Sequence, residues 1–541
     1  MDQEDKARGP GEVDTVFIGA EYEENLSIRT LASAVRESGL RAAVVPFNKV
    51  SDLDEVAAGV MSRSPAFVGL SMAFQHRAAQ FLELAAGLRT RGYGGHICAG
   101  GQFPTVSGED VLRLNPFIDT VISHDAEESI GLLVGSLDDR KRWSTVPGLL
   151  FREEDGSIHR CGLSPVMRDL DALPLPARDG SLHVHVGKGF TTLVGSRGCY
   201  GNCTFCAINS YCRSRPGPRL RFRSPESIAR EMAFLYHEKG ARIFCFHDDT
   251  WLLPNARRTE ARLGELASRL EKLGVGRIAT VAKTRPDAIT APLMSFLRER
   301  LGLVRVYVGV ENFSERGLQN LGRRMDMETV RKGLRACDEA GVYSCYNILL
   351  FEPDTRLEDI GCNIDAIGRF PHIPFNFSRT EAYNGTAIWH KLRREGRLKG
   401  NYLSADYEIA DPSVEALFRI TSQAFKDRNF AHDAMANINS SLGYELKVLE
   451  HFSGDEKKNE LEELKKEAGR VMRSVNSDTL ERLREAFLFV ERGSWKNRRD
   501  MIEFTIDLAR KINFNGAGLY SDLLDVRQEI RNMIHWTAGE N

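Results

Sequence analysis

The sequence predicts an α/β protein in three parts: an N-terminal doubly wound parallel sheet, a full or partial (β/α) barrel, and a C-terminal α-helical domain. Short apolar runs alternate with amphipathic stretches over residues 15–130, and the alternation returns between about residues 190 and 398. Beyond residue 404 apolar residues recur only at helical spacing. The chain of 541 residues is also too long for one ordinary core, so several domains are expected.

The first sheet is expected from five apolar runs with helical patterns between them, such as residues 26–38 and 76–91. Ligands of doubly wound sheets bind at the carboxyl ends of the strands. In this chain the ends fall at residues 19–24, 71–75 and 100–105, which therefore hold candidate ligand contacts. The five runs are residues 16–19, 42–46, 66–71, 96–100 and 118–122.

Two glycines follow the fourth run of the first sheet. Gly100 and Gly101 let the backbone approach a flat ligand without a Cβ in the way, although a tight turn explains them equally well. Phe103 and Pro104 either pack on such a ligand or on the domain core. The strand end at residues 100–105 thus predicts a binding loop with a structural alternative.

The segments around the first sheet set the expected domain boundaries. Residues 1–14 are charged and lack the apolar run of a signal peptide, so they are expected to be a disordered tail. The first domain is placed at residues 15–137. A linker with a small hairpin and a proline-rich stretch is placed at residues 138–182. The barrel is expected over residues 183–403 and the helical domain over residues 404–541.

The barrel is predicted from six apolar runs separated by helical patterns. Chemistry in such barrels takes place at the carboxyl ends of the strands, so polar residues there become site candidates. The candidates are Asp249, Arg285, Glu311 and Asn347. The runs are residues 190–194, 243–246, 278–282, 304–310, 342–350 and 375–377.

Three cysteines follow the first barrel run at Cys-x-x-x-Cys-x-x-Cys spacing. Cys199, Cys203 and Cys206 can together hold three irons of a four-iron four-sulfur cluster, which usually takes four cysteine ligands. No fourth cysteine continues the spacing, so one iron keeps an open position for a substrate or cofactor. That is the geometry of a catalytic cluster.

Other interpretations of the three thiols are a zinc site, a disulfide pair or unrelated buried cysteines. Zinc takes four ligands, often as two separated pairs. The next cysteine, Cys212, lies six residues on within a basic stretch, and no histidine lies close by. Cys212 is therefore interpreted as a bystander, and the cluster is favoured. Thiolate ligands need a reducing compartment, which predicts a cytoplasmic protein.

The cysteine spacing, with the aromatic Phe205 before the last thiol, resembles the signature of the radical S-adenosylmethionine (SAM) enzymes. The resemblance implies that the open iron binds the amino and carboxylate groups of SAM. Electron transfer from the cluster then cleaves SAM to methionine and a deoxyadenosyl radical. It also implies an electron donor such as flavodoxin or ferredoxin.

The first domain resembles the cobalamin-binding domain that precedes the barrel in one radical SAM subclass. Residues 25–39, 68–71 and 100–105 carry the resemblance. The Asp-x-His-x-x-Gly pattern that supplies a histidine to cobalt is absent, so a cobalt without a protein histidine is expected. A domain that has lost its ligand, or binds another, is the alternative. The implied cobalamin contacts are Asn25, Ser71, Gly100, Gly101, Gln102, Phe103 and Pro104.

The same resemblance assigns SAM contacts in the barrel. Residues 309–314 resemble a recurrent radical SAM segment whose glutamate, here Glu311, lies near SAM. A carboxylate can bind the ribose or the amino group, and an arginine can pair with the carboxylate of SAM. These side chains can instead cap helices or join surface ion pairs. Together with the candidates at strand ends, the expected SAM contacts are Phe205, Asp249, Arg285, Glu311 and Asn347.

Two places depart from the family pattern. Residues 350–354 replace a frequent Gly-Leu-Pro-Gly turn with a bulky aromatic and two acids, so backbone geometry or substrate shape must differ there. Asn384 stands where proline is frequent. Residue roles implied by the family resemblance are therefore less applicable near these two positions.

The composition of the chain limits the classes of molecule that it is expected to bind. A net charge of -2 and a pI of about 6.7 provide no general basic field, so nucleic acid is not expected. No stretch reaches the ~20 apolar residues of a membrane span, so no membrane partner is expected either. A small-molecule or peptide substrate remains, together with the cofactors that the resemblance implies: a 4Fe-4S cluster, SAM and cobalamin.

Three functions are compatible with this sequence. The leading hypothesis is a cobalamin-dependent radical SAM methyltransferase that acts on an unactivated carbon of a small-molecule or natural-product substrate. The second is a radical rearrangement, oxidation or cyclisation with the same cofactors and no methyl transfer. The third is a non-catalytic iron-sulfur or corrinoid carrier. The sequence names no catalytic side chain, substrate, oligomeric state or role for the helical domain.

Overall fold

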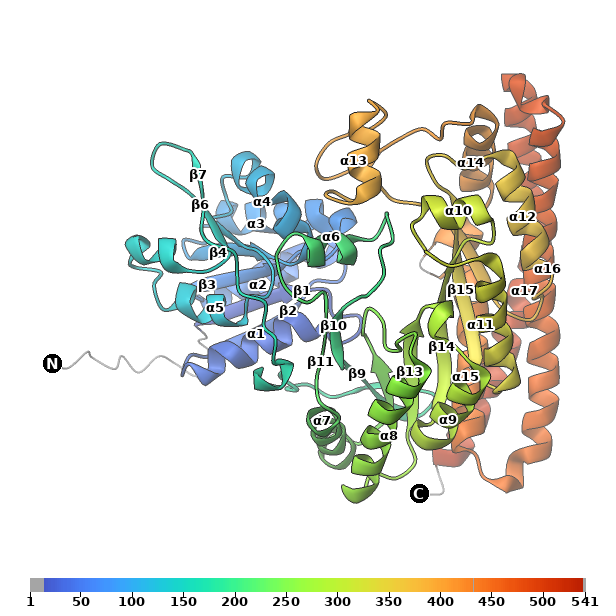
Figure 1. Ribbon diagram of the computed structural model, residues 1–541, viewed down its shortest axis with the longest axis horizontal. Helices are drawn as coiled ribbons and strands as arrows, with labels where there is room; N and C mark the ends of the chain where they lie inside the picture. Colours follow the sequence, from blue (N-terminus) through green and yellow to red (C-terminus); the bar gives the residue numbers. More distant parts are fainter. Residues whose placement is uncertain (1–13, 432, 539–541) are drawn as a thin grey trace.

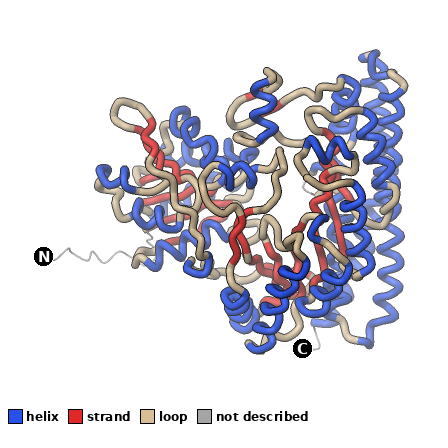
Figure 2. Tube along the Cα trace, viewed as in Figure 1, coloured by secondary structure: helices blue, strands red, loops and turns tan. Residues whose placement is uncertain are grey.

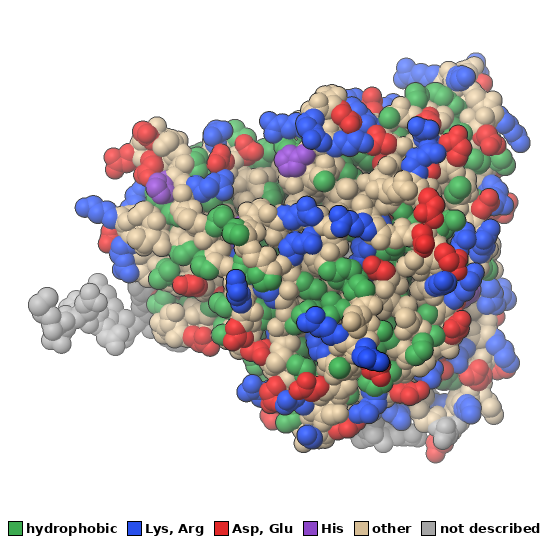
Figure 3. Space-filling view, in the orientation of Figure 1, with side chains coloured by type: hydrophobic (Ala, Val, Ile, Leu, Met, Phe, Trp, Pro, Cys, Tyr) green, Lys and Arg blue, Asp and Glu red, His purple; other side chains and the backbone are tan. Residues whose placement is uncertain are grey.

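The computed structural model describes residues 14–538 except residue 432. Two sheets lie side by side, and long C-terminal helices form a layer against the second sheet (Figure 1). The expected tail, apart from Asp14, lies outside the described residues. Acidic and basic side chains are interspersed over the face seen in Figure 3. Across the described part of the chain, no helix combines the length and apolar character that crossing a bilayer requires.

The N-terminal domain is a doubly wound sheet, as predicted. Its first five strands are parallel and ordered β2-β1-β3-β4-β5. α1 and α5 cover one face, and α2, α3 and α4 cover the other. The elements are β1 (Thr15–Gly19), α1 (Leu26–Glu37), β2 (Ala42–Pro46), α2 (Leu53–Arg63), β3 (Phe67–Ser71), α3 (Ala78–Thr90), β4 (His96–Gly100), α4 (Gln102–Leu114), β5 (Thr120–Ile122) and α5 (Glu127–Val134).

The hairpin that the sequence places in the linker belongs to this first sheet. β6 (Leu149–Arg152) pairs antiparallel with β5, and β7 (Ile158–Arg160) pairs with β6. Leu149, Leu150 and Phe151 are buried, so the hairpin completes the core instead of bridging two domains. It also covers the edge of β5, which would otherwise present unpaired backbone groups. The expected domain boundary at residue 137 therefore cuts through the sheet.

The second sheet is a partial barrel with strand order β16-β15-β14-β13-β12-β9-β8. β9 to β16 of this sheet are parallel, and β8 is an antiparallel edge strand. Figure 2 shows helices outside these strands. The strands are β8 (His183–His185), β9 (Lys188–Leu193), β12 (Ala241–Phe246), β13 (Ala279–Thr284), β14 (Leu303–Glu311), β15 (Tyr343–Phe351) and β16 (Phe375–Arg379).

Helices and two small ribbons complete the barrel domain. Val306, Val308 and Val310 of β14 join the core beneath the outer helices, so the alternate residues of β14 face the concave side. The remaining elements are β10 (Ser196–Gly198), α6 (Ala207–Arg213), β11 (Leu220–Phe222), α7 (Pro225–Glu238), α8 (Ala256–Lys272), α9 (Ala291–Leu301), α10 (Glu315–Asn320), α11 (Met327–Glu339), α12 (Leu357–Ile367), α13 (Ala387–Arg394), β17 (Lys399–Gly400) and β18 (Ala405–Asp406).

The C-terminal part is helical, as predicted, and one of its helices packs inside the barrel. Tyr444 and Val448 of α15 contact Phe190, Ile243 and Val304 at the amino-terminal ends of the barrel strands. α15 therefore closes that end of the concave face. The helices are α14 (Pro412–Ala424), α15 (Met435–Phe452), α16 (Lys458–Glu491) and α17 (Arg498–Ala538).

Candidate active site

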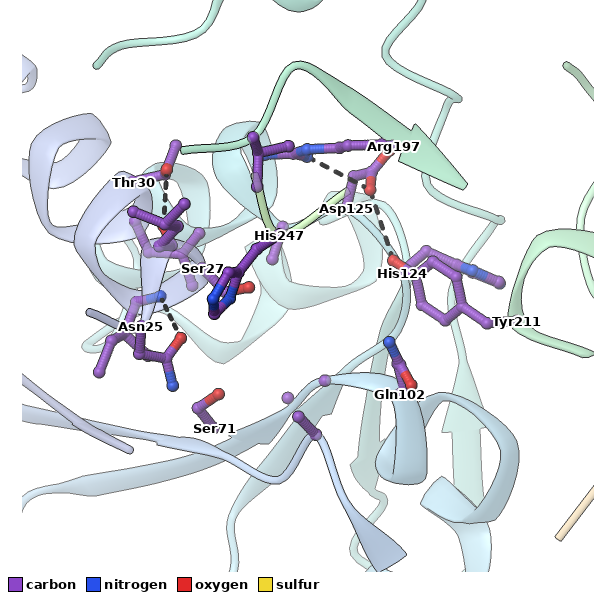
Figure 4. A pocket seen from close by; sticks show the side chains of 18 of the residues that line it. Asn25, Ser27, Thr30, Ser71, Gln102, His124, Asp125, Arg197, Tyr211 and His247 are labelled. Atoms are coloured by element: carbon purple, nitrogen blue, oxygen red, sulfur yellow. Dashed lines mark hydrogen bonds and ion pairs between the residues drawn. The ribbon is translucent and has the colours of Figure 1, made fainter. Parts of the chain in front are cut away.

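A cavity of about 960 Å³ lies between the carboxyl ends of the two sheets. Its wall is built from strand-end loops of both domains and from the proline-rich linker at residues 173–176. Figure 4 shows polar side chains from both domains around it, including Asn25, Ser71, Gln102 and His247. Of the seven expected cobalamin contacts, six line this cavity and the buried Pro104 does not.

The part of the cavity within the N-terminal domain is deep and apolar. It extends between the sheet and the helices α1 and α5, where Phe17, Phe67 and Ile130 line it. A glycine is required at the mouth, because Gly101 has a φ of 110° and an added Cβ would lie 3.0 Å from the carbonyl carbon of Met72. This shape fits a large ligand with a flat body and a long arm.

Two histidines of the N-terminal domain, His124 and His96, occupy different environments. His124 lines the cavity, and its buried Nδ1 has no hydrogen-bond partner among the described residues. Burial lowers the pKa of His124 to about 4, so its ring is neutral at pH 7. His96 instead stacks on Phe67 and bonds Thr120 at 2.8 Å, away from the cavity. His124 is therefore the one of these two that a bound ligand can reach.

The cysteine loop lies between β10 and α6, at the carboxyl end of the barrel. The backbone N–H of Gly201 donates to Cys199 Sγ at 3.3 Å. Nη1 of Arg285 and Nη1 of Arg323 donate to Cys203 Sγ at 3.4 and 3.2 Å. Cys206 lines the cavity, and burial raises its pKa to about 12, so it is protonated until a metal replaces the proton.

The three thiols share one loop at the carboxyl end of the barrel. Within the described ranges, no three His, Cys, Asp or Glu side chains converge closely enough to hold one metal ion. In a four-iron cluster each cysteine holds a different iron, so the thiols need not converge. The two guanidinium groups beside Cys203 add positive charge where thiolates gather.

The two aspartates after β12 have different environments. Asp248 is buried and accepts hydrogen bonds from the Gly195 N–H and the Ser196 hydroxyl. Asp249 lines the cavity and accepts from the Gly198 N–H at 3.1 Å. Burial raises the pKa of Asp249, because a carboxylate with few partners is costly to ionise there. The structure therefore leaves Asp249 available to a cationic ligand.

Three other expected SAM contacts lie away from the cavity wall. Arg285 is buried, pairs with Asp287 at 3.1 Å and lies behind the cysteine loop. Glu311 has a φ of 65°, and its carboxylate lies 3.9 Å from Arg323. Burial raises the pKa of Glu311. Asn347 is exposed on β15, while Phe205 lines the cavity beside Cys206.

Asp125 is a site residue that the sequence analysis missed. It follows β5 in the N-terminal domain and accepts from Arg215 at 2.6 Å and Arg221 at 2.8 Å, both near the cysteine loop. Arg197 lies 3.5 Å away. These arginines lower the pKa of Asp125 to about 2. The only signal in the sequence was a basic stretch without an acidic partner nearby.

Further contacts between the domains surround the cavity. His247 Nε2 lies 2.7 Å from the Glu23 carboxylate, which joins the loop after β12 to the loop after β1. Gln75 and Asn384 exchange hydrogen bonds of 2.8 and 3.2 Å. Asn384, the residue that departs from the family pattern, therefore helps to attach the barrel to the N-terminal domain.

The acidic turn after β15 is held by ordinary structural contacts. Glu352 accepts from the Asn320 side chain at 2.7 Å. Asp354 pairs with Lys391 and with Arg397. The altered turn is therefore stabilised from α13 and its flanks, and neither acid lines the cavity.

Two family models match the chain in the regions that build the cavity. Residues 193–360 match the Radical SAM superfamily, and residues 19–134 match the B12 binding domain. The first implies a 4Fe-4S cluster and SAM, and the second implies cobalamin. The expected cofactors are thus confirmed at the level of domains.

Relatives with curated names are distant. A Pyrococcus horikoshii protein named uncharacterized methyltransferase PH0819 is 25% identical over 54% of this chain and 62% of its own length. The hopanoid C-3 methylase of Methylococcus capsulatus is 24% identical over 72% of this chain and 71% of its own length. The chain thus spans less than two thirds of the Pyrococcus protein.

Solved structures share the fold. The cobalamin-dependent SAM radical enzyme OxsB with aqua-cobalamin bound superposes with a TM-score of 0.65 at 15% identity, covering 96% of this chain and 85% of OxsB. The radical SAM methyltransferase TsrM from Kitasatospora setae superposes with a TM-score of 0.57 at 16% identity, covering 71% and 75%. The three-part architecture is therefore an established fold.

Proposed function

We propose that this chain, which belongs to the radical SAM enzymes that carry a cobalamin-binding domain, is a methyltransferase acting on an unactivated carbon of a small molecule or natural product. One observation carries the proposal: strand-end loops of the N-terminal domain and Cys206 of the cysteine loop line the same cavity. A methyl group and a radical can then be delivered to one enclosed place. The relatives named methyltransferase and methylase support this reaction.

The cavity residues fit the three cofactors. When bound, cobalamin supplies the methyl group, and the cluster and SAM supply the electron and the radical. Cys199, Cys203 and Cys206 would hold the cluster. The deep apolar pocket and the glycine mouth would hold cobalamin, with the neutral His124 ring and its unpartnered Nδ1 beside it.

Charged side chains near the cysteine loop would bind SAM. An ammonium group next to Asp249 would offset the burial that raises the pKa of this carboxyl. Glu311, Arg285 and Arg323 form a second group in which one carboxylate and two guanidinium groups lie behind Cys203. We assign the recognition of the charged end of SAM to these residues.

The linker and the contacts between domains would keep water out. Residues 173–176 form one wall of the cavity, and the pairs His247–Glu23 and Gln75–Asn384 join the domains around it. Exclusion of water protects a radical from side reactions and strengthens the electrostatic interactions within the site.

A reaction without methyl transfer is the second candidate. Its specific support is a relative named anaerobic magnesium-protoporphyrin IX monomethyl ester cyclase from Synechocystis, which is 25% identical over 46% of this chain and 48% of its own length. The same cofactors can serve a cyclisation or an oxidation. The products distinguish the two candidates, because only a methyltransferase consumes the methyl group of SAM.

We further propose a cytoplasmic protein that receives electrons from a small donor such as flavodoxin or ferredoxin and binds no nucleic acid. All ten cysteines are free thiols, as expected in a reducing compartment. The near-zero net charge supports the absence of a nucleic-acid partner.

The test is anaerobic reconstitution with iron, sulfide and cobalamin, followed by reaction with SAM and a strong reductant. We expect both deoxyadenosine and S-adenosylhomocysteine, because the proposed reaction cleaves one SAM and demethylates another. Deoxyadenosine without S-adenosylhomocysteine would favour the second candidate. Bound iron and cobalt without either product would indicate a non-catalytic iron-sulfur or corrinoid carrier.

A further inference from the structure

Three polar side chains, Lys283, Tyr307 and Asn347, are exposed on the strands of the partial barrel, and we call the space over them the hollow. Tyr307 is on β14, which is paired on both sides, yet its side chain is 40% exposed. The residues on either side of it, Val306 and Val308, are buried under the outer helices. Because side chains alternate along a strand, the exposed ring of Tyr307 faces the concave side.

The hollow continues into the cavity between the domains. Lys283 of β13 is in register with Tyr307, is exposed, and also lines the cavity. Asn347 of β15 is exposed two residues beyond Cys345, which is the register partner of Tyr307 on that strand. Lys283, Tyr307 and Asn347 therefore form one polar wall that runs across three adjacent strands.

This wall contains a lysine that forms no ion pair with any described residue. Among the residues that the structure describes, the ammonium group of Lys283 donates no hydrogen bond and joins no ion pair. The carboxyl group of Asp249 interacts electrostatically with Lys283, and this interaction partly offsets the rise in the pKa of Asp249 that burial causes. Glu23, the other carboxylate at this end, is paired with His247. An unpaired lysine in a hollow attracts an anion.

A second cation lies beneath Tyr307. Arg305 is 6% exposed, and its guanidinium carbon lies 3.9 Å from the centre of the Tyr307 ring. Its Nη2 donates to Cys345 Sγ at 3.3 Å and Ser440 Oγ at 3.2 Å, and its Nε has no partner. No carboxylate of the described residues pairs with it. Arg305 therefore adds positive potential under the floor of the hollow and fixes the ring of Tyr307.

We propose that Lys283 anchors an anionic group of the substrate, with Tyr307 and Asn347 as hydrogen-bonding partners, and that the substrate is a carboxylate or phosphate compound. The ammonium group is a point charge that accepts either anion. Because α15 closes the amino-terminal end of the hollow, the anionic end of the substrate would stop there and the rest would extend toward the cavity. This inference rests on the proposed function, since it takes the hollow to be the substrate site.

The test measures anion binding to the cluster- and cobalamin-loaded protein without SAM. The probes are inorganic phosphate, followed by ³¹P line broadening, and succinate, followed by proton saturation transfer. Lys283→Met is compared with Lys283→Arg and with Lys272→Met, which removes an exposed lysine at the end of α8. We expect Lys283→Met to weaken binding of at least one probe tenfold or more, while the other two variants bind like the wild type.

The site of the anion is then separated from that of SAM. At saturating SAM, phosphate or succinate should still bind, and Lys283→Met should weaken that binding as much as it does without SAM. Displacement of the probes by SAM, or unchanged probe binding in Lys283→Met, would overturn the inference. Iron and cobalt contents equal to those of the wild type exclude misfolding.

Failure of this inference differs from failure of the proposed function. If anions bind through Lys283 but SAM is not cleaved, the binding site stands and the radical reaction does not. If SAM is cleaved and no probe depends on Lys283, the enzyme stands and the substrate class is wrong. A preference for phosphate over succinate, or the reverse, identifies which anion the substrate carries.

Discussion

Replacing Asp125 with Asn removes one buried negative charge from the contact between the N-terminal domain and the cysteine loop. The exchange keeps the size of the side chain. It leaves Arg215 and Arg221, both under 10% exposed, without the carboxylate that lies 2.6 and 2.8 Å from them. The amide that takes its place can accept a hydrogen bond but directs its own N–H groups toward guanidinium donors.

The size of the effect follows from the pKa and from the burial. A pKa of about 2 against the ordinary 3.8 corresponds to about 2.4 kcal/mol, at ~1.36 kcal/mol for each pKa unit. Removing one partner of a buried ion pair costs roughly 3–5 kcal/mol, because the other charge stays buried. We therefore expect Asp125→Asn to lower the stability of the protein by about 2–5 kcal/mol at pH 7.

The lowered pKa of Asp125 determines how the stability difference between wild type and Asp125→Asn changes with pH. A carboxyl whose pKa is lower in the folded state stabilises the fold fully above its unfolded pKa and loses that contribution as the pH falls through the folded pKa. The difference between wild type and Asp125→Asn should therefore be constant near neutrality and shrink between about pH 4 and pH 2.

The assay is urea unfolding of the apoprotein at several pH values, with iron retention of the loaded protein as a second measurement. Glu128→Gln is the matched control, because Glu128 is an exposed acid in the first turn of α5, three residues from Asp125. Asp125→Asn should also lose iron faster, since its arginines flank the cysteine loop. If it is no less stable than Glu128→Gln at pH 7, the three-arginine contact does not hold the domains together.

Three further predictions concern the cofactor sites. Alanine at any of the three loop cysteines should abolish SAM cleavage and lower bound iron, whereas Cys212→Ala should retain both; equal iron loss in Cys212→Ala would revise the ligand set. Glu311→Gln should weaken SAM binding about ten- to a hundredfold, because a charge-assisted hydrogen bond contributes roughly 1.5–3 kcal/mol, and unchanged SAM titrations would make this residue structural. Electron paramagnetic resonance of the Co(II) form should show no nitrogen splitting from protein, and a splitting that His124→Ala removes would contradict the expected histidine-free cobalt.

Local patterns predicted the strands well. The run at residues 304–310 became β14, and the run at 243–246 became β12, because alternating buried side chains leave a signal within a few residues. The three-part fold class followed from such runs. The polar strand ends also marked the right edge of each sheet, and Asp249 and Ser71 do line the cavity.

Contacts between distant segments were not predictable in this way. Leu149 to Phe151 read as part of a linker hairpin, and nothing in their spacing shows that they pair with β5. Tyr444 lies in an ordinary helical pattern, yet it packs among barrel strands more than 130 residues earlier, such as β14. Asp125 and its arginines are separated by 72 to 96 positions. Such pairs depend on how whole domains dock, which short-range periodicity does not record.

The position of α15 limits the routes by which ligands can enter and leave the barrel. Tyr444 and Val448 pack against the amino-terminal ends of the strands, so ligands cannot enter the barrel from that end. Anything that reacts in the hollow has to arrive and depart on the side that faces the N-terminal domain, past Lys283 and the pair His247–Glu23. The loops that line that side of the cavity then determine which molecules reach the hollow.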